Sequence, residues 1–341
     1  MKTGAGRRAS SIAKNMIRGV GAMASAPRIF CPSKYLRSCR SGFTTGDGGF
    51  SGAKNRQGMT ARRVVIQYCP VPSGLDRYVS VLFYCEIDLG EGERLHDVLF
   101  PDWASLRFHY GASIEGTMRS GSSIAGCRFT VAGPRSEEVR FSMGPARQWG
   151  FRLTPLGWAA LVGVSADRYA NVLADGDQDE AFARLRPLYD LLAHEESPGE
   201  QLDLLIAFLE AVPRRVVPHE GLILALCDAL TDTEVRSATD LAARVRAHPR
   251  MVERICRAAF GFTPKLLLRR QRFLRSIEQF TLEPKRKWIG AIDAAYHDQA
   301  QFVRDFRAFM GMTPRQYAQL EKPVTGPLMR ERARHARLMG R

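Results

Sequence analysis

The sequence has no long apolar run and none of the short motifs that identify common enzyme sites. No window of about 18 consecutive apolar residues occurs, so we expect no membrane-spanning helix and no membrane partner. The glycine-rich phosphate loop, the dinucleotide fingerprint, the nucleophile elbow and the H-E-x-x-H zinc motif are also absent. These absences argue against an enzyme.

Paired cysteines and clustered metal ligands are missing as well. The seven cysteines are an odd number without a C-x-x-C pair, and His96 and His109 are separated in sequence without an H-x-H motif. We therefore expect no disulfide framework, no metal and no cofactor. Cys227 and Cys256 occupy apolar positions of predicted helices, where a reduced thiol acts as a small hydrophobe. A reducing cytoplasm fits this use of cysteine.

The positive charge is distributed unevenly. Of the net charge of +15, residues 1–60 contribute +10, residues 61–220 contribute −6, residues 221–323 contribute +7 and residues 324–341 contribute +4. A mildly acidic middle part is thus followed by a basic C-terminal part. We expect a polyanion-binding surface in the second half of the chain.

The chain is longer than a single hydrophobic core usually supports, which predicts at least two domains. Short β-branched and aromatic runs between Val64 and Leu153 predict strands of a β-barrel or sandwich, with helices following from Leu156. The fold class is therefore α+β, with an all-helical second domain. The predicted parts are a disordered basic segment at 1–60, a β-rich regulatory domain with C-terminal helices at 61–212, a proline-containing linker at 213–220, a helical domain at 221–322 and a basic tail at 323–341.

One predicted helix carries an apolar stripe whose partner the sequence leaves open. Ser197 is a plausible N-cap before Pro198, and the stripe itself consists of leucine and isoleucine at helical spacing. Either the β-layer of the same domain or the same helix of a second subunit could cover it. The stripe is formed by Leu202, Leu205, Ile206 and Leu209.

Aromatic and acidic residues of the β-rich part also allow two interpretations. Trp103, Trp149 and Trp158 could line a small-molecule pocket, although core packing is the commoner use of tryptophan. Asp102, between Pro101 and Trp103, has the local sequence of a turn between strands. A turn is a better interpretation of this aspartate than a catalytic carboxylate.

The helical part begins with two short helices joined by a tight turn. The segment SATDLAARVRA offers Ser237 or Thr239 as N-cap, and RMVERICRAAFGF follows after His248 and Pro249. This arrangement is typical of a helix-turn-helix unit. Helical spacing places Val252, Ile255 and Ala259 inward and Arg250, Glu253, Arg254 and Arg257 outward. Such an outward face suits the major groove, although a solvated charged face is an equally good interpretation on composition alone.

A repeat about fifty residues later decides between these interpretations. A small apolar segment, WIGAIDAAY, precedes a turn at His297 and Asp298 and a second helix, QAQFVRDFRAFMG. The first unit ends in AAFGFTPKLLLRR and the second in AFMGMTPRQYAQL. Gly261 and Gly311 predict left-handed helix ends, and each is followed by a Thr-Pro that starts the next helix. A repeat of this specificity favours two DNA-binding units.

The stretch from Leu222 to Leu320 resembles the DNA-binding domain of the AraC/XylS family of transcription regulators, most closely in DQAQFVRDFRAFMGMTPRQY at Asp298–Tyr317. The resemblance implies two helix-turn-helix units joined by a long helix at Pro264–Phe280. It implies that base edges are read by Arg250, Glu253, Arg254, Gln299, Gln301 and Arg304. Candidate phosphate contacts are Arg257, Lys265, Arg269, Arg270, Lys285, Arg286, Lys287 and Arg307, although for any one of them alone a solvated surface charge is the commoner role.

The β-rich part resembles, more loosely, the sensor-like domain of one group of the same family, in RYVSVLFYCE at Arg77–Glu86, in DVLFPDWASLRFHYG at Asp97–Gly111 and in FRLTPLGWAALVGV at Phe151–Val164. It implies a regulatory domain without an identifiable effector. The resemblance therefore implies a sequence-specific regulator of transcription in the cytoplasm, associated with the nucleoid. Its expected partner is double-stranded DNA, and further candidate partners are RNA polymerase, a small-molecule effector and a second copy of the chain. The alternatives are a catalytic or ligand-sequestering N-terminal domain with weak nonspecific nucleic-acid binding, and a nonspecific binder of RNA or other polyanions.

Overall fold

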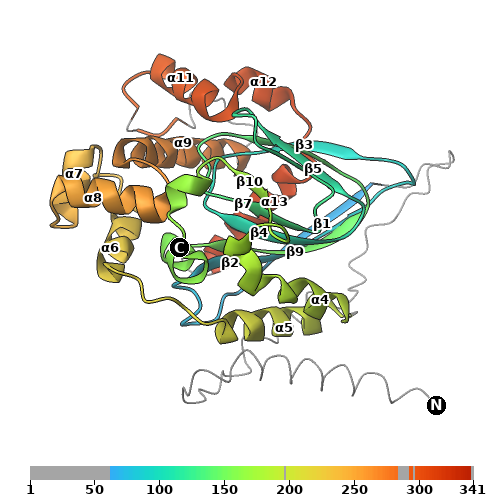
Figure 1. Cartoon of the computed structure of the whole chain (residues 1–341). Coiled ribbons are helices and arrows are strands. Elements are labelled where there is room, and N and C mark those ends of the chain that lie inside the picture. Colours follow the sequence, from blue (N-terminus) through green and yellow to red (C-terminus); the bar gives the residue numbers. More distant parts are fainter. Residues whose placement is uncertain (1–61, 196, 283–291, 295, 339–341) are drawn as a thin grey trace, which may run out of the picture.

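The computed structural model describes residues 62–338 except 196, 283–291 and 295 (Figure 1), so the predicted disordered segment at 1–60 lies outside the described residues. The N-terminal part is a sandwich of two antiparallel sheets that do not close into a barrel. The larger sheet has the order β1 (Arg63–Cys69), β2 (Val79–Asp88), β9 (Ala146–Leu153), β4 (Ser105–Gly111), β7 (Phe129–Ala132) and β10 (Leu173–Asp175). The smaller sheet has the order β3 (Leu95–Leu99), β8 (Val139–Met143), β5 (Ile114–Met118) and β6 (Ser123–Ala125).

The alternation of side chains along β4 separates two environments. Leu106 and Phe108 are fully buried in the core beneath the helices, where Phe108 stacks on Phe129. Successive residues of a strand point to opposite faces, so Arg107 and His109 point toward the smaller sheet. The space between the sheets therefore contains polar groups, whereas the opposite face of the larger sheet is apolar.

Helices after β9 cover the apolar face of the larger sheet. Leu202, Leu205 and Leu209 of α5 are buried in the core of the β-rich part, and Ile206 packs against the same core. The stripe is thus covered within the same chain. Ser197 occupies the predicted N-cap position of α5, although its side chain accepts no capping hydrogen bond. The elements of this layer are α3 (Pro155–Gly157), η1 (Trp158–Val162), η2 (Ala166–Tyr169), η3 (Glu180–Leu185), α4 (Pro187–Ala193) and α5 (Pro198–Ala211).

The predicted linker connects α5 to the helical part and has no regular structure over 213–217. It lies against the first part, because the Arg215 amide donates to the Ala160 carbonyl and Arg214 lies over the Tyr78 ring. The helices that follow are α6 (Glu220–Thr231), α7 (Ala238–Arg244), α8 (Pro249–Ile255), η4 (Cys256–Phe260), α9 (Pro264–Leu282), α11 (Gln299–Met310), α12 (Pro314–Gln319) and α13 (Thr325–Leu338).

The two parts share two apolar clusters rather than touching through the linker alone. Leu156, after β9, is fully buried among residues of α6 to α9. Phe100, after β3, is buried with Phe273 of α9 and Phe306 of α11. Dispersion and hydrophobic burial therefore fix the helical part against the sandwich.

The C-terminal segment, which the sequence identifies only as a basic tail, forms helix α13 and returns to the sandwich. Val324 and Met329 are buried, and Leu328 packs against residues of β1 and β2. Figure 1 shows α13 lying among the strands, away from α7 and α8.

Candidate nucleic-acid interface

The first helix-turn-helix unit is formed by α7 and by α8 with its extension η4. The Ser237 hydroxyl accepts from the Asp240 amide, while the Asp240 carboxylate accepts from the Ser237 amide, which completes a capping box. Pro249 occupies the first turn of α8, and His248 is its N-cap. Ser237 is therefore the cap, as one of the two predicted alternatives.

The residues of α8 and η4 divide between core and surface as predicted. Val252, Ile255 and Ala259 are buried in the core of the helical part. Arg250, Arg254 and Arg257 are exposed, and Glu253 is partly exposed. Glu253 and Arg257 form an ion pair of 2.9 Å, and Arg254 lies 3.4 Å from the Nε2 atom of His219.

The second unit is described from its turn onward. The Asp298 side chain accepts from the Gln301 amide, and the Gln301 side chain accepts from the His297 amide, so Gln301 serves as part of the helix cap. Gln299 and Arg304 are exposed on α11. The predicted preceding segment at 288–296 lies mostly outside the described residues.

The ends of the two recognition segments repeat closely. Gly261 and Gly311 both adopt left-handed backbone conformations, with φ of 83° and 65°. Their amides donate to the Arg257 and Arg307 carbonyls at 3.1 and 3.0 Å, respectively. The repeat places Arg254 and Arg304 at matching positions, each seven residues before its glycine. The two units therefore present an arginine at the same place on their exposed faces.

The threonines after these glycines also repeat. The Thr263 hydroxyl accepts from the Leu266 amide at 3.3 Å, and the Thr313 hydroxyl accepts from the Gln316 amide at 3.2 Å. The Gln316 side chain completes a capping box at Thr313. The predicted Thr-Pro helix starts are confirmed in both units.

Helix α9 joins the units, and the two arginines of this helix that were predicted to contact phosphate, Arg269 and Arg270, have structural partners. Arg269 forms an ion pair of 2.6 Å with Asp305 of α11, which ties the joining helix to the second recognition segment. Arg270 is 0% exposed, and its guanidinium carbon lies 3.9 Å from the Trp103 ring centroid. The predicted phosphate contact of Arg270 is therefore wrong for this arrangement, because the side chain is buried at the interface with the sandwich.

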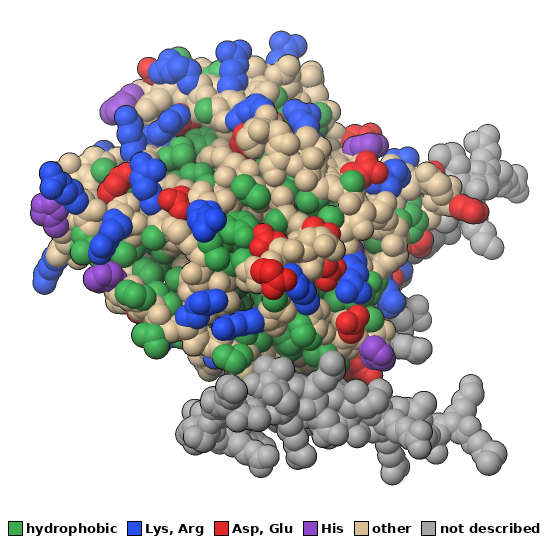
Figure 2. Space-filling model, in the orientation of Figure 1, with side chains coloured by type: hydrophobic (Ala, Val, Ile, Leu, Met, Phe, Trp, Pro, Cys, Tyr) green, Lys and Arg blue, Asp and Glu red, His purple; other side chains and the backbone are tan. Residues whose placement is uncertain are grey.

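The other candidate phosphate contacts have different positions. Lys265 and Arg307 are exposed at the start of α9 and near the end of α11, and Arg257 is exposed beside Glu253. Figure 2 shows Lys and Arg side chains gathered over α7, α8, α11 and α12. The remaining candidates, Lys285, Arg286 and Lys287, lie outside the described residues.

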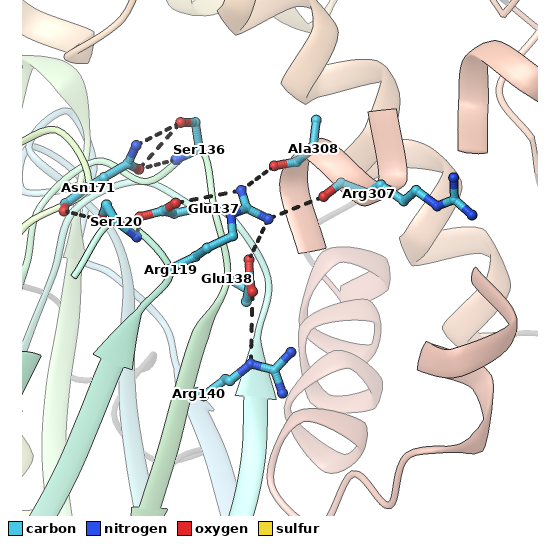
Figure 3. Close-up of polar contacts among 9 residues, drawn as sticks. All are labelled: Arg119, Ser120, Ser136, Glu137, Glu138, Arg140, Asn171, Arg307 and Ala308. Atoms are coloured by element: carbon cyan, nitrogen blue, oxygen red, sulfur yellow. Dashed lines mark hydrogen bonds and ion pairs between the residues drawn. The ribbon is translucent and has the colours of Figure 1, made fainter. Parts of the chain in front are cut away.

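Arg119, in the turn between β5 and β6, binds the C-terminal end of α11 (Figure 3). Its guanidinium donates to the Arg307 and Ala308 carbonyls at 3.2 and 2.5 Å, while the Arg307 side chain points away from it. It also lies 3.6 Å from a Glu137 oxygen and 3.4 Å from a Glu138 oxygen. A cation at a helix C-terminus opposes the negative end of the helix dipole. The sandwich therefore holds the C-terminal end of the second recognition segment through Arg119, in addition to the apolar contact of Phe100 with Phe306.

The loop between β3 and β4 carries a charge network at the same interface. The Asp102 carboxylate forms an ion pair of 2.8 Å with Arg152. Burial alone would raise the pKa of Asp102, but the positive charges of Arg152, Arg332 and Arg135 hold it well below its usual range. Asp102 is thus a structural counter-ion within an inter-strand loop, which agrees with the turn interpretation.

The described part of the structure gives little support for a small-molecule pocket lined by the tryptophans. It gives equally little support for a metal site at the histidines. Trp149 and Trp158 are buried in the core beneath the helices. Within the described part of the chain, no group of three or more His, Cys, Asp or Glu side chains is placed to hold a metal ion. Among the same residues, no helix is both long and apolar enough to cross a membrane.

Comparison with known proteins finds a family match in this region. Residues 241–319 match the family model described as a helix-turn-helix domain. This range covers the end of α7, α8, α9, α11 and α12, and it confirms the helix-turn-helix domain that the sequence motifs indicate. No protein of curated function matches the chain.

Solved structures give weaker likenesses. ToxT from Vibrio cholerae O395 is 11% identical, with a TM-score of 0.39, covering 66% of this chain and 96% of that one. Unsaturated fatty acid bound ToxT from Vibrio cholerae strain SCE256 is 10% identical, with a TM-score of 0.38 and coverage of 76% and 96%. The AraC-like transcriptional activator CuxR is 14% identical, with a TM-score of 0.21 and coverage of 62% and 86%.

Proposed function

We propose that this chain, a transcription regulator whose C-terminal part is a helix-turn-helix DNA-binding domain of the AraC/XylS type, reads two adjacent major-groove segments with α8 and α11. The observation that carries the proposal is the repeat of the two recognition segments. Arg254 and Arg304 occupy equivalent exposed positions before the left-handed glycine ends, Gly261 and Gly311. Each unit therefore offers the same donor to its own groove segment.

Base reading and phosphate binding fall to different exposed residues. We assign base edges to Arg250, Glu253 and Arg254 in α8, and to Gln299, Gln301 and Arg304 in or beside α11. Gln301 contributes through the part of its amide that remains free of the cap. Lys265, Arg257 and Arg307 are the described side chains available for phosphate, and Arg269 positions α11 through Asp305.

The sandwich has a regulatory rather than a catalytic role in this proposal. Its loops hold α9 through Trp103 and α11 through Arg119, so a change in the sandwich can alter how the recognition segments are presented. A small-molecule effector bound within the sandwich would act through these contacts.

The direct test is selection of duplexes from a random pool by the full-length chain, followed by sequencing of the retained DNA. We expect an enriched sequence with two elements about one helical turn apart, because the recognition segments repeat within one chain. Arg254→Ala and Arg304→Ala should each relax a different element. Salt-sensitive retention without enrichment would instead identify a nonspecific polyanion binder.

A further inference from the structure

A cavity lies between the two sheets, on the polar face of β4. Its volume is about 50 Å³, and its walls are mostly apolar side chains of both sheets, such as Phe83, Phe141 and Leu173. A water molecule needs only about 10–15 Å³ on this scale. The present space therefore accommodates a few waters or a very small organic group.

Part of the lining of this cavity is polar and cationic. Arg107 lines it, and its guanidinium donates one hydrogen bond of 2.9 Å to the Ser105 hydroxyl. Across the described residues, Arg107 has no ion pair. Gln148 also lines the cavity, is 6% exposed, and its Oε1 atom accepts no hydrogen bond from the described residues. An apolar space lined by an arginine that forms no ion pair with the described residues suits a small apolar molecule with one anionic group.

The C-terminal helix supplies one wall of the same cavity. Val324, directly before α13, and Leu328 in its first turn line it together with the strands. The Asp97 carboxylate holds this helix start by accepting from the Val324 and Thr325 amides at 2.8 and 2.6 Å. The Thr325 hydroxyl donates to the Val98 carbonyl at 3.1 Å. These polar contacts at one end of α13 therefore add to the apolar packing of Leu328 and Met329 in docking the helix.

Helix α13 also contacts the joining helix of the DNA-binding domain. Met329 is buried in the cluster that contains Phe273 and Ile277 of α9. Arg332 lies near enough to Asp102 for its charge to lower the pKa of that carboxyl. The same helix thus touches the cavity on one side and α9 on the other.

We propose that α13 is a ligand-displaced gate: a small apolar anion bound at Arg107 takes the space of Val324 and Leu328, and the release of α13 loosens the contact between the sandwich and α9. Ligand and docked helix exclude one another because the remaining space is too small for both. The effect on DNA binding rests on the proposed function, whereas the binding site and the displacement do not.

The ligand class is tested with hexanoate and 1-hexanol, which share an alkyl chain and differ in charge. Titration calorimetry on the full-length chain should show hexanoate binding that Arg107→Gln weakens about tenfold, since one charge-assisted contact is lost, while 1-hexanol binding stays unchanged. Arg147→Gln, on the exposed side of the neighbouring strand, is the matched control. Equal weakening of both probes, or no hexanoate binding at millimolar concentration even in Leu328→Ala, would overturn the site.

The gate is tested by hydrogen exchange of α13 and by variants that weaken its docking. Hexanoate should speed exchange at the Val324 and Thr325 amides at least tenfold, and Asp97→Asn and Leu328→Ala should each bind hexanoate several-fold tighter because the competing helix is weakened. Arg330→Ala, on the exposed side of α13, should change neither the exchange of the Val324 and Thr325 amides nor the affinity for hexanoate. Hexanoate binding with unchanged α13 exchange would refute the gate.

These measurements are made without DNA. Their results therefore remain valid even if the duplex selection fails to enrich a sequence. Where selection yields an enriched duplex, hexanoate should change its affinity for the wild-type chain and not for Arg107→Gln. An affinity change of equal size in both proteins would overturn the link between the cavity and α9.

Discussion

Arg270 of α9 lies over the ring of Trp103, with its guanidinium carbon 3.9 Å from the ring centroid. Its Nη1 atom donates to the Arg135 carbonyl at 2.9 Å, and the whole side chain is 0% exposed. Burial lowers the pKa of Arg270 to about 9, which still leaves it charged at neutral pH. A cation from the DNA-binding domain is therefore enclosed by a loop of the sandwich, and it joins the two parts at their centre.

A double-mutant cycle should measure the strength of the interaction between Arg270 and Trp103. Arg270→Met and Trp103→Leu are each expected to lower the free energy of unfolding, and the cycle should give a coupling of about 1–2 kcal/mol, because a desolvated cation and ring attract more strongly than in water. Chemical denaturation of the four proteins supplies the values. A cycle of Trp103→Leu with Lys265→Met, on the exposed side of α9, is the control. A coupling within error of that control would mean that Arg270 is held by its backbone acceptor alone.

The burial of Arg270 could have been predicted from helical spacing. Leu267 and Phe273 are three residues away on either side, Ile277 is seven residues on, and all three are fully buried. The arginine therefore belongs to the apolar stripe of α9 and not to its exposed face. Residue type suggested a phosphate contact, and the position in the stripe was the better guide.

Local sequence signals predicted where the helices of the DNA-binding domain begin and end. They could not predict contacts between residues that are far apart in the chain. Gly261, Gly311 and Thr313 act through neighbours within a few residues, so their roles follow from sequence. Arg119 meets the Ala308 carbonyl from far away in the chain. No periodicity or motif relates such partners, because tertiary packing alone brings them together.

The Arg119 contact should contribute to stability mainly by neutralising buried carboxylates. Glu137 and Glu138 are 6% and 2% exposed, so Arg119→Ala leaves their charges poorly compensated and should lower the free energy of unfolding by about 1–3 kcal/mol. Adding Glu138→Gln should recover part of this loss, because a neutral amide costs less to bury. The Arg140 side chain lies 3.9 Å from Glu138 and is 57% exposed, so Arg140→Ala should change the free energy of unfolding by less than about 0.5 kcal/mol. If the double variant is no more stable than Arg119→Ala, carboxylate burial is not the cause.

Base-reading and phosphate-binding residues should respond differently to substitution. Arg304→Ala should weaken binding to the selected duplex by about 1–3 kcal/mol and relax preference at one base position. Lys265→Ala should weaken all duplexes alike and reduce the magnitude of the slope of log affinity against log salt by about 0.9. Fluorescence anisotropy over a range of salt concentrations, on selected and scrambled duplexes, separates these outcomes. Uniform loss for Arg304→Ala would reassign that residue to phosphate.

His109 should make the folded chain sensitive to mild acid. Burial, with a smaller effect from the positive charge of Arg107, lowers the pKa of His109 to about 3, while its Nε2 atom lies 2.8 Å from the Thr130 hydroxyl. In the unfolded chain the imidazole has a pKa of about 6.5. Between about pH 6.5 and pH 3 the imidazole therefore binds a proton in the unfolded state but not in the folded state. His109 therefore contributes no pH dependence above about pH 6.5, and the free energy of unfolding falls as pH decreases below that value.

The slope attributable to His109 approaches about 1.4 kcal/mol per pH unit well below pH 6.5. His109→Gln should show a shallower loss of stability between about pH 6 and pH 4, measured by urea denaturation at each pH. Its stability at pH 7 reports separately on the lost contact with Thr130. His96→Gln replaces an exposed histidine of β3 and is the matched control substitution. Parallel curves for the wild-type chain and His109→Gln would show that the imidazole is protonated in the folded state as readily as in the unfolded one, so the surroundings of His109 would be more hydrated than its burial indicates.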